Sequence, residues 1–115
     1  MQFALLFNPL PSYTAQFADP TKAPALMSAW HAYMGAMAQA GVMVTSVRLQ
    51  GAHVATTVRV QNDRRVVQDG PFAETKEILG GFVVIEVPSL DEALKWAERS
   101  PSSSNGSTEV RPVMA

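Results

Sequence analysis

Apolar residues fall into short runs separated by proline, glycine and polar residues, a pattern typical of a chain that mixes strands and helices. Residues 2–7 form an apolar run that stops at Asn8 and Pro9, which predicts a buried first strand. Residues 56–60 alternate between two faces, and residues 80–87 are rich in β-branched side chains, so both predict strands. Three further strands are predicted at residues 42–49, 65–68 and 109–113.

The first predicted helix begins near Pro24, or one turn earlier at Pro20, and ends at Gly41. Its apolar side chains form one stripe at three- and four-residue spacings: Leu26, Trp30, Tyr33, Met34 and Met37. The opposite face is small and uncharged, and it comprises Ala25, Ser28, Ala32, Gly35 and Gln39. Because an exposed helix normally carries charge there, we expect a second copy of the chain to cover part of this face. The alternative is an alanine-rich surface helix.

The second predicted helix opens with a capping box, in which Ser89 is the N-cap and Glu92 follows three residues later. Pro101 lies just beyond its end. Its expected buried face consists of Leu90, Ala93, Leu94 and Ala97.

Two connections carry prolines or polar residues and are predicted to be loops. Residues 8–22 exceed the usual length of a connection, so we expect them to form a lid or the rim of a pocket. Residues 102–108 are polar and are expected to be flexible. A turn at Asn62 and Asp63, which accept positive φ, is expected to join two strands into a hairpin.

The order of these elements predicts one α+β domain over residues 1–115. Two helices and four main strands in the order βαββαβ, with an extra hairpin, give a ferredoxin-like antiparallel sheet covered by helices on one face. The other face of such a sheet stays open. In a chain of 115 residues we expect a homodimer to bury it.

Composition excludes several classes of function. The net charge is −1, and no basic patch with interleaved aromatic residues is present, so nucleic acid is not an expected partner. The absence of cysteine excludes disulfides and fits a cytoplasmic protein. Residues 23–47 carry no charge but are rich in Ala, Ser and Gly rather than Leu and Ile, so we expect neither a membrane span nor a signal peptide.

Residues 68–77 carry the most unusual chemistry in the chain. Gly70 accepts positive φ and Pro71 fixes its own φ, so this stretch predicts a rigid turn. Asp69 ends the strand before that turn, where a buried carboxylate is able to act as a general base. The competing interpretation is that Asp69 caps the turn by accepting backbone N–H bonds.

Other residues are weaker chemical candidates. Thr75 and Lys76 are predicted to bind a substrate carboxylate, unless Lys76 only joins a surface charge cluster. Phe72 is expected in the core or in the wall of a pocket. His31 is a candidate proton shuttle, with Trp30 and Tyr33 as neighbours in a substrate site; the alternative is a structural histidine. His53 lies in the connection over residues 50–55 and is a weaker candidate than these residues.

No metal or cofactor is expected. The two histidines and the acidic residues show no ligand spacing, and the chain has neither a phosphate-binding glycine motif nor a nucleophile elbow.

The run Asp-Gly-Pro-Phe-Ala-Glu-Thr-Lys-Glu over residues 69–77, followed by Gly-Gly-Phe, resembles the signature of the DGPF-motif branch of the YCII-related proteins. Residues 55–59 and 109–113 fit the same family. The resemblance implies a dimeric α+β barrel. It also implies a distant similarity to a dehydrochlorinase of chlorinated hydroxyquinols, and in some members an association with extracytoplasmic-function sigma factors.

The YCII branch is associated with a His–Asp pair whose histidine lies on the first helix. His31 is on that helix here, but its last residues include no acid, and the register counted back from Gly41 places Trp30 at the equivalent position.

Three functions therefore remain open. The first is a lyase-like or dehydrochlorinase-like enzyme for a small organic acid or phenol, with Asp69 as base, His31 assisting, and Thr75 and Lys76 orienting the substrate. The second is a regulatory homodimer that binds a metabolite or a sigma factor. The third is a central loop that only stabilises the dimer.

Overall fold

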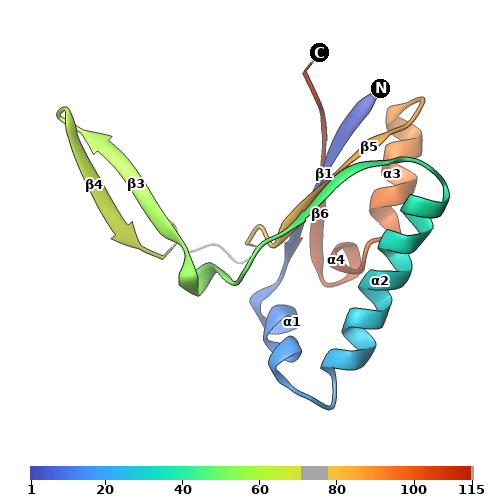
Figure 1. Ribbon diagram of the computed structural model, residues 1–115, viewed down its shortest axis with the longest axis horizontal. Helices are drawn as coiled ribbons and strands as arrows, with labels where there is room; N and C mark the ends of the chain where they lie inside the picture. The colour runs from blue at the N-terminus through green and yellow to red at the C-terminus, as the bar shows by residue number, and fades with distance from the viewer. Residues whose placement is uncertain (71–77, 115) are drawn as a thin grey trace.

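A computed structural model of the chain describes residues 1–70 and 78–114 (Figure 1). The strands are β1 (Gln2–Pro9), β2 (Met43–Arg48), β3 (Thr56–Gln61), β4 (Arg64–Asp69), β5 (Gly81–Glu86) and β6 (Gly106–Pro112). The α-helices are α1 (Pro11–Ala15), α2 (Ala23–Gln39), α3 (Leu90–Glu98) and α4 (Pro101–Ser104), and short 3₁₀ turns lie at η1 (Gln16–Ala18) and η2 (Ala52–Val54).

Four strands form the main sheet in the order β2-β5-β1-β6, and every neighbouring pair is antiparallel. The hairpin β3–β4 is a separate two-stranded sheet. Without that hairpin, the strands and the two long helices follow the βαββαβ order, with the first and third strands in the centre of the sheet. The predicted ferredoxin-like fold with an additional hairpin is therefore confirmed.

The core lies between the sheet and the two long helices. Alternate residues of the central strands point into it: Phe3, Leu5 and Phe7 from β1, and Val83 and Ile85 from β5. Tyr33 and Met37 of α2 and Ala93 and Ala97 of α3 are buried against this same cluster. The predicted stripe of α2 is confirmed, because its opposite face, including Ala32 and Gly35, is exposed.

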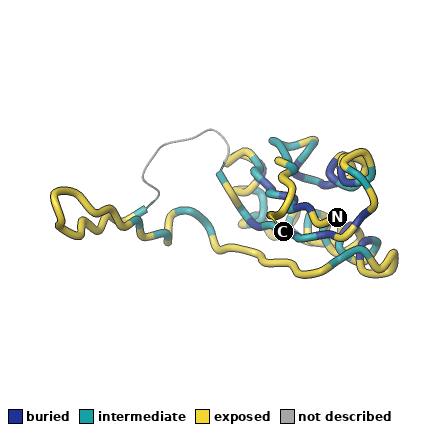
Figure 2. The backbone as a smooth tube through the Cα atoms, turned by 90° about the horizontal axis from the view of Figure 1, so that it is seen from above, coloured by how far each residue is buried: buried dark blue, intermediate teal, exposed yellow. Residues whose placement is uncertain are grey.

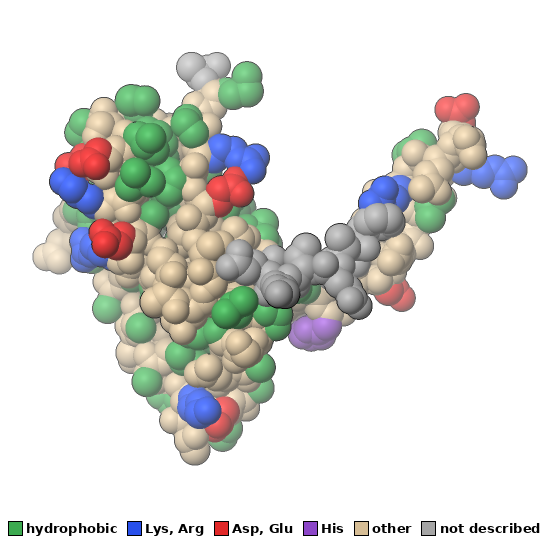
Figure 3. All heavy atoms as spheres, turned by 180° about the vertical axis from the view of Figure 1, so that it is seen from behind, with side chains coloured by type: hydrophobic (Ala, Val, Ile, Leu, Met, Phe, Trp, Pro, Cys, Tyr) green, Lys and Arg blue, Asp and Glu red, His purple; other side chains and the backbone are tan. Residues whose placement is uncertain are grey.

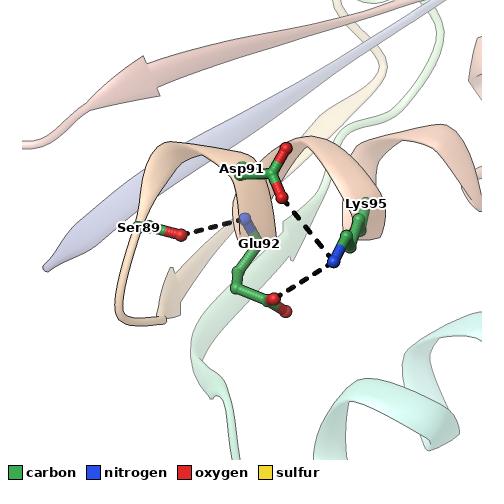
Figure 4. A network of polar contacts seen from close by, with 4 residues as sticks. All are labelled: Ser89, Asp91, Glu92 and Lys95. Atoms are coloured by element: carbon green, nitrogen blue, oxygen red, sulfur yellow. Dashed lines mark hydrogen bonds and ion pairs between the residues drawn. The ribbon is translucent and has the colours of Figure 1, made fainter.

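Helix ends follow the expected residues. Gly41 has φ 71°, its N–H donates to the Ala38 carbonyl, and Val42 N–H donates to the Met37 carbonyl, so α2 ends in the predicted glycine motif. Ser89 caps α3 by accepting the Glu92 N–H at 3.2 Å (Figure 4).

The Glu92 carboxylate pairs with Lys95 at 3.3 Å, and Asp91 pairs with the same ammonium group at 3.6 Å (Figure 4). Ser89 therefore satisfies one backbone N–H at the start of α3, while the Glu92 side chain forms an ion pair with Lys95, one turn further along the helix.

The expected buried face of α3 is only half right. Ala93 and Ala97 are buried, but Leu90 and Leu94 remain 49% and 47% exposed. The helix approaches the sheet on its alanine side, because small side chains permit a close contact there, and the two leucines lie on the flank of this contact.

Both predicted loops contain regular structure. Residues 8–22 include α1 and η1, and Tyr13 is 5% exposed, so this segment is packed onto the body. Residues 102–108 are not a flexible linker, because α4 and the start of β6 occupy them. Ser100 and Ser102 are 2% and 0% exposed.

Four hydroxyl groups connect α4, β6 and the end of α3 in one chain. Ser103 donates to the Ala97 carbonyl at 2.6 Å, which uses its only proton. Thr108 must then donate to Ser103 at 2.7 Å, and Ser102 to Thr108 at 2.7 Å. Ser100 in turn donates to Ser102 at 2.8 Å. These bonds satisfy the hydroxyl groups that the apolar pattern could not account for.

The β3–β4 hairpin projects away from the body, and its two strands pack mainly against each other (Figures 1 and 2). Asn62 and Asp63 have φ 51° and 63°, which confirms the predicted turn with positive φ at its tip. The radius of gyration is 15.9 Å, whereas a compact chain of this length is expected near ~13 Å. The projecting hairpin accounts for the excess.

Candidate functional site

Asp69 lies where the hairpin joins the body. It is the last residue of β4, directly opposite Thr56, and it is exposed. Gly70 follows with φ 84°, its N–H donates to the Ala55 carbonyl at 2.6 Å, and its carbonyl accepts the Thr57 hydroxyl at 2.8 Å. The glycine conformation that the sequence predicts is therefore present, and these two hydrogen bonds hold the base of the hairpin.

The Asp69 carboxylate accepts no hydrogen bond from residues 1–70 or 78–114. Within that part of the chain, the turn at Gly70 is held by backbone atoms and by Thr57. The predicted roles of Phe72, Thr75 and Lys76 fall outside the residues that the structure describes.

An apolar hollow of about 510 Å³ adjoins the base of the hairpin. It is lined by Leu49, Gln50, Gly51, Ala52, Val54, Ala55, Ile78 and Leu79. Its size falls within the range of small-molecule sites. Ala55, whose carbonyl binds Gly70 N–H, is part of its wall, so Asp69 lies one residue from the rim.

The apolar wall is what sequence reasoning missed. Leu49, Val54 and Leu79 are 43%, 56% and 41% exposed in the single chain. Val54 and Leu79 lie in connections without periodicity, and Leu49 lies just past the end of β2 although the sequence predicted it as the last residue of that strand, so the sequence gives no signal that these residues come together. The only available hint was the apolar content of these irregular segments.

His53, ranked low from the sequence, lies in the same segment. A Cβ atom on Gly51 would lie 2.7 Å from Nδ1 and 2.8 Å from Cε1 of the His53 ring. Glycine at position 51 therefore leaves room for the imidazole to lie over the backbone that lines the hollow.

Trp30 and Tyr33 come together in an aromatic cluster on the core side of the sheet. Their ring centroids are 6.1 Å apart, and Phe7 lies 5.0 Å from Trp30 and 6.1 Å from Tyr33, all edge to face. The Trp30 indole N–H donates to the Tyr13 hydroxyl at 3.0 Å, and Tyr13 packs edge to face on Phe17. These contacts fix the rings in position.

Both tyrosines of this cluster stay neutral at ordinary pH. Burial raises the pKa of Tyr33, opposed by the charge of Arg99, and its hydroxyl donates to the Trp96 carbonyl at 2.8 Å. Burial also raises the pKa of Tyr13, opposed by the hydrogen bond from Trp30. The cluster therefore supplies a rigid aromatic wall rather than a base.

Two backbone hydrogen bonds connect the aromatic cluster with the hollow. Gly80 N–H donates to the Phe7 carbonyl at 2.8 Å, and Leu49 N–H donates to the Gly80 carbonyl at 2.9 Å. The guanidinium of Arg48, next to Leu49, lies 5.7 Å from the centre of the Phe17 ring. The contact between this cation and an aromatic ring therefore adjoins Leu49, which lines the hollow.

His31 is exposed on α2, next to the half-buried Trp30. The hairpin that carries Asp69 projects away from the body to which α2 belongs (Figure 1). Within the described residues, the structure brings Trp30 and Tyr33 together but does not join His31 to Asp69 through any contact.

The same residues 1–115 match the family model described as the YCII-related domain. The chain belongs to the YCII-related family. An uncharacterised protein of Rhizobium meliloti strain 1021 is 46% identical over 77 residues, which are 65% of this chain and 62% of that relative. The match therefore spans less than two thirds of the relative's length.

Among solved structures, the chain is similar to the 5-chloro-2-hydroxyhydroquinone dehydrochlorinase TftG from Burkholderia phenoliruptrix AC1100, in complex with 2,5-dihydroxybenzoquinone. The TM-score is 0.56 at 19% identity, over 99% of this chain and 94% of that one. At this identity the similarity supports the fold alone.

No group of three His, Cys, Asp or Glu side chains comes together within residues 1–70 and 78–114. No helix in the described part of the chain is long and apolar enough to cross a membrane.

Proposed function

We propose that this YCII-related chain is a homodimer that binds a small organic acid or phenol in the hollow beside the hairpin and acts on it by proton transfer. The observation that carries the proposal is the position of Asp69, whose carboxylate has no partner among the described residues and whose neighbour Gly70 donates to Ala55, a residue that lines an apolar hollow of about 510 Å³. Apolar walls suit an aromatic ring, and a carboxylate at the rim suits removal of a proton.

A lyase-like reaction fits these groups. The Asp69 carboxylate would take a proton from a carbon of the substrate, the C–H electron pair would form a double bond, and a neighbouring leaving group such as chloride would depart with its own bonding pair. Arg48, which directly precedes Leu49 in the chain, would supply the positive charge for an anionic substrate at the edge of the hollow. The complex of TftG with a dihydroxybenzoquinone supports a quinol-like substrate class.

The homodimer is supported by the open face of the sheet. Residues directly opposite in antiparallel strands point to the same side, so Ala4 and Leu6 share this face with Phe82, Val84 and Val47. Charged residues on this face lie at its margins: Glu109 and Arg111 of the edge strand β6 pair with each other, and Glu86 at the end of β5 pairs with the Met1 ammonium. An apolar centre with a polar edge is typical of a surface that a second sheet covers.

The first test is a thermal-shift screen of wild type and Asp69→Asn against small carboxylic acids, phenols and hydroxyquinols. A ligand at about a hundred times its dissociation constant should stabilise the folded state by about 2.7 kcal/mol. We expect such a ligand to stabilise wild type and to lose most of its effect on Asp69→Asn. Turnover should fall by about 10²-fold or more if Asp69 is the base.

Asp63→Asn is the matched control, because Asp63 lies at the tip of the same hairpin in a conformation that asparagine also accepts. It should bind ligand like wild type. A ligand that stabilises Asp69→Asn and wild type equally would place the site elsewhere. If no ligand binds and Asp69→Asn alone melts earlier, Asp69 is a structural residue of the turn.

A further inference from the structure

The β3–β4 hairpin, here called the arm (residues 56–69), has one face rich in valine. Pairing places Val58 opposite Val67 and Val60 opposite Arg65, so the three valines share a face, with Arg65 near its tip and the pair Thr56 and Asp69 at its base. The other face carries Arg59, Arg64 and Val66 with polar residues. This alternation is the pattern of a sheet that is covered on one side.

Nothing in the described body covers the valine face. Val58, Val60 and Val67 are 57%, 72% and 49% exposed. Figure 3 shows the arm as a separate lobe on which apolar side chains lie open between charged ones. An isolated two-stranded hairpin is marginally stable in water, so an arm of this length requires a contact that the single chain does not provide.

We propose that the valine face of the arm packs against a second copy of this chain and is part of the dimer interface. The proposal rests on the homodimer proposed above and deepens it. In a two-fold dimer both chains use the same surfaces. Each chain contributes one arm and one open sheet face, and it covers the arm and the sheet face of its partner. A different protein would not provide the matching arm and sheet face that a second copy provides.

The area of the sheet also favours a larger interface. Four strands of about six residues present a face of roughly 400 Å² in plan, from strand spacings of about 4.8 Å and a rise of about 3.4 Å per residue. A standard interface buries about 800 Å² on each partner. One face of the two-stranded arm adds roughly 200 Å², about half as much again, on the same strand dimensions.

The test compares the association of wild type and two hairpin variants by sedimentation velocity over a dilution series. Val58→Asp with Val67→Asp places two charges on the valine face and should weaken the dimer at least about tenfold. Val66→Asp is the matched control, because Val66 lies on the opposite face of the same arm and is 41% exposed. It should associate like wild type. All three positions are exposed in the single chain, so the core is not altered.

A second measurement does not depend on weakening the dimer. The chain has no cysteine, so Val58→Cys and Val66→Cys each accept one polarity-sensitive fluorophore. The label at position 58 should shift to the blue at concentrations where the dimer forms and return on dilution. The label at position 66 should not change.

The outcomes separate this proposal from the one on which it rests. If the double variant stays dimeric while Val84→Asp, on the open sheet face, becomes monomeric, the arm is not in the interface and the dimer stands. If wild type is monomeric at about 100 µM, both the dimer and the arm contact are wrong. Ligand binding in the thermal-shift screen is measured independently of both results.

Discussion

At the scale of single residues, Tyr33 connects packing with pH. It is 5% exposed, its ring packs on Phe7 and Trp30, and its hydroxyl donates to the Trp96 carbonyl of α3. One side chain of α2 thus joins the sheet and the other helix. Burial, opposed by the charge of Arg99, raises its pKa above the ordinary value of 10.0.

This raised pKa predicts that the folded state loses stability above pH 10. The unfolded chain releases the Tyr33 proton near pH 10.0, whereas the folded chain keeps it, so the free energy of unfolding falls as the pH rises through this range. Tyr33→Phe should cost about 1 kcal/mol at pH 7 through the lost hydrogen bond. Above pH 10 its disadvantage should shrink, because phenylalanine does not titrate. Urea unfolding between pH 7 and 11 measures both effects.

An equal slope for wild type and Tyr33→Phe above pH 10 would assign the alkaline loss to other groups. Tyr13→Phe is the comparison, because burial raises the pKa of Tyr13 as well, and its hydroxyl accepts from Trp30 instead of donating to a carbonyl.

Single residues also show how much of the candidate site is predictable from the sequence. Asp69 is a candidate from sequence because Gly70 and Pro71 follow it, and Gly70 has the predicted positive φ. The hollow beside it was not predictable from sequence. Leu49 and Val54 lie about 25 residues before Leu79, and hydrophobic periodicity does not show that two such distant segments come together. His31 lies on the helix that carries the family's histidine, but the register places Trp30 at the equivalent position, and a position on a helix does not determine which groups lie opposite it.

At the scale of elements, periodicity predicted the strands and long helices, and it failed where contacts rather than periods decide. Ala93 and Ala97 repeat at the same spacing as Leu90 and Leu94, yet only the alanines are buried, because distance between α3 and the sheet selects for size. The serines after Pro101 appear polar and flexible in sequence. They are buried because they satisfy one another, which no single-residue property shows.

Two glycines give a test at this scale, with opposite expected signs. A Cβ on Gly81 of β5 would lie 2.6 Å from the Val47 carbonyl oxygen, so Gly81→Ala must push β2 away and should cost about 1–3 kcal/mol. Gly35 of α2 has no atom within 4 Å of such a Cβ, so Gly35→Ala should raise the free energy of unfolding by up to about 1 kcal/mol. Denaturant unfolding at one protein concentration compares the two.

A stabilising Gly81→Ala would mean that β2 is free to move away from β5. A destabilising Gly35→Ala would instead indicate that a second chain packs closely on this face of α2, as the uncharged sequence of that face first suggested.

At the scale of the whole molecule, the single chain is a thin plate with an arm. Its principal extents are 47, 43 and 19 Å, and the shortest of these holds one sheet and one layer of helices. If a second chain packs on the open sheet face, X-ray scattering should give twice the mass of one chain and a shortest dimension about 20 Å greater, since two packed sheets lie about 10 Å apart with helices outside them. Val84→Asp should return the particle to one mass and to a radius of gyration near the 15.9 Å of the single chain.

The hydroxyl chain from Ser100 to the Ala97 carbonyl has a consequence for which sequences this fold accepts. Each hydroxyl proton in this chain has one acceptor, so the hydrogen bonds all run in one direction, and every hydroxyl group is both a donor and an acceptor. Valine has the shape of threonine and a higher preference for strands, and by volume it would suit position 108. Valine at position 108 would nevertheless leave the Ser102 hydroxyl without its hydrogen-bond acceptor and the Ser103 hydroxyl without its donor. The need for a side chain that both donates and accepts a hydrogen bond, rather than the volume of the site, therefore determines the residue at position 108 of β6.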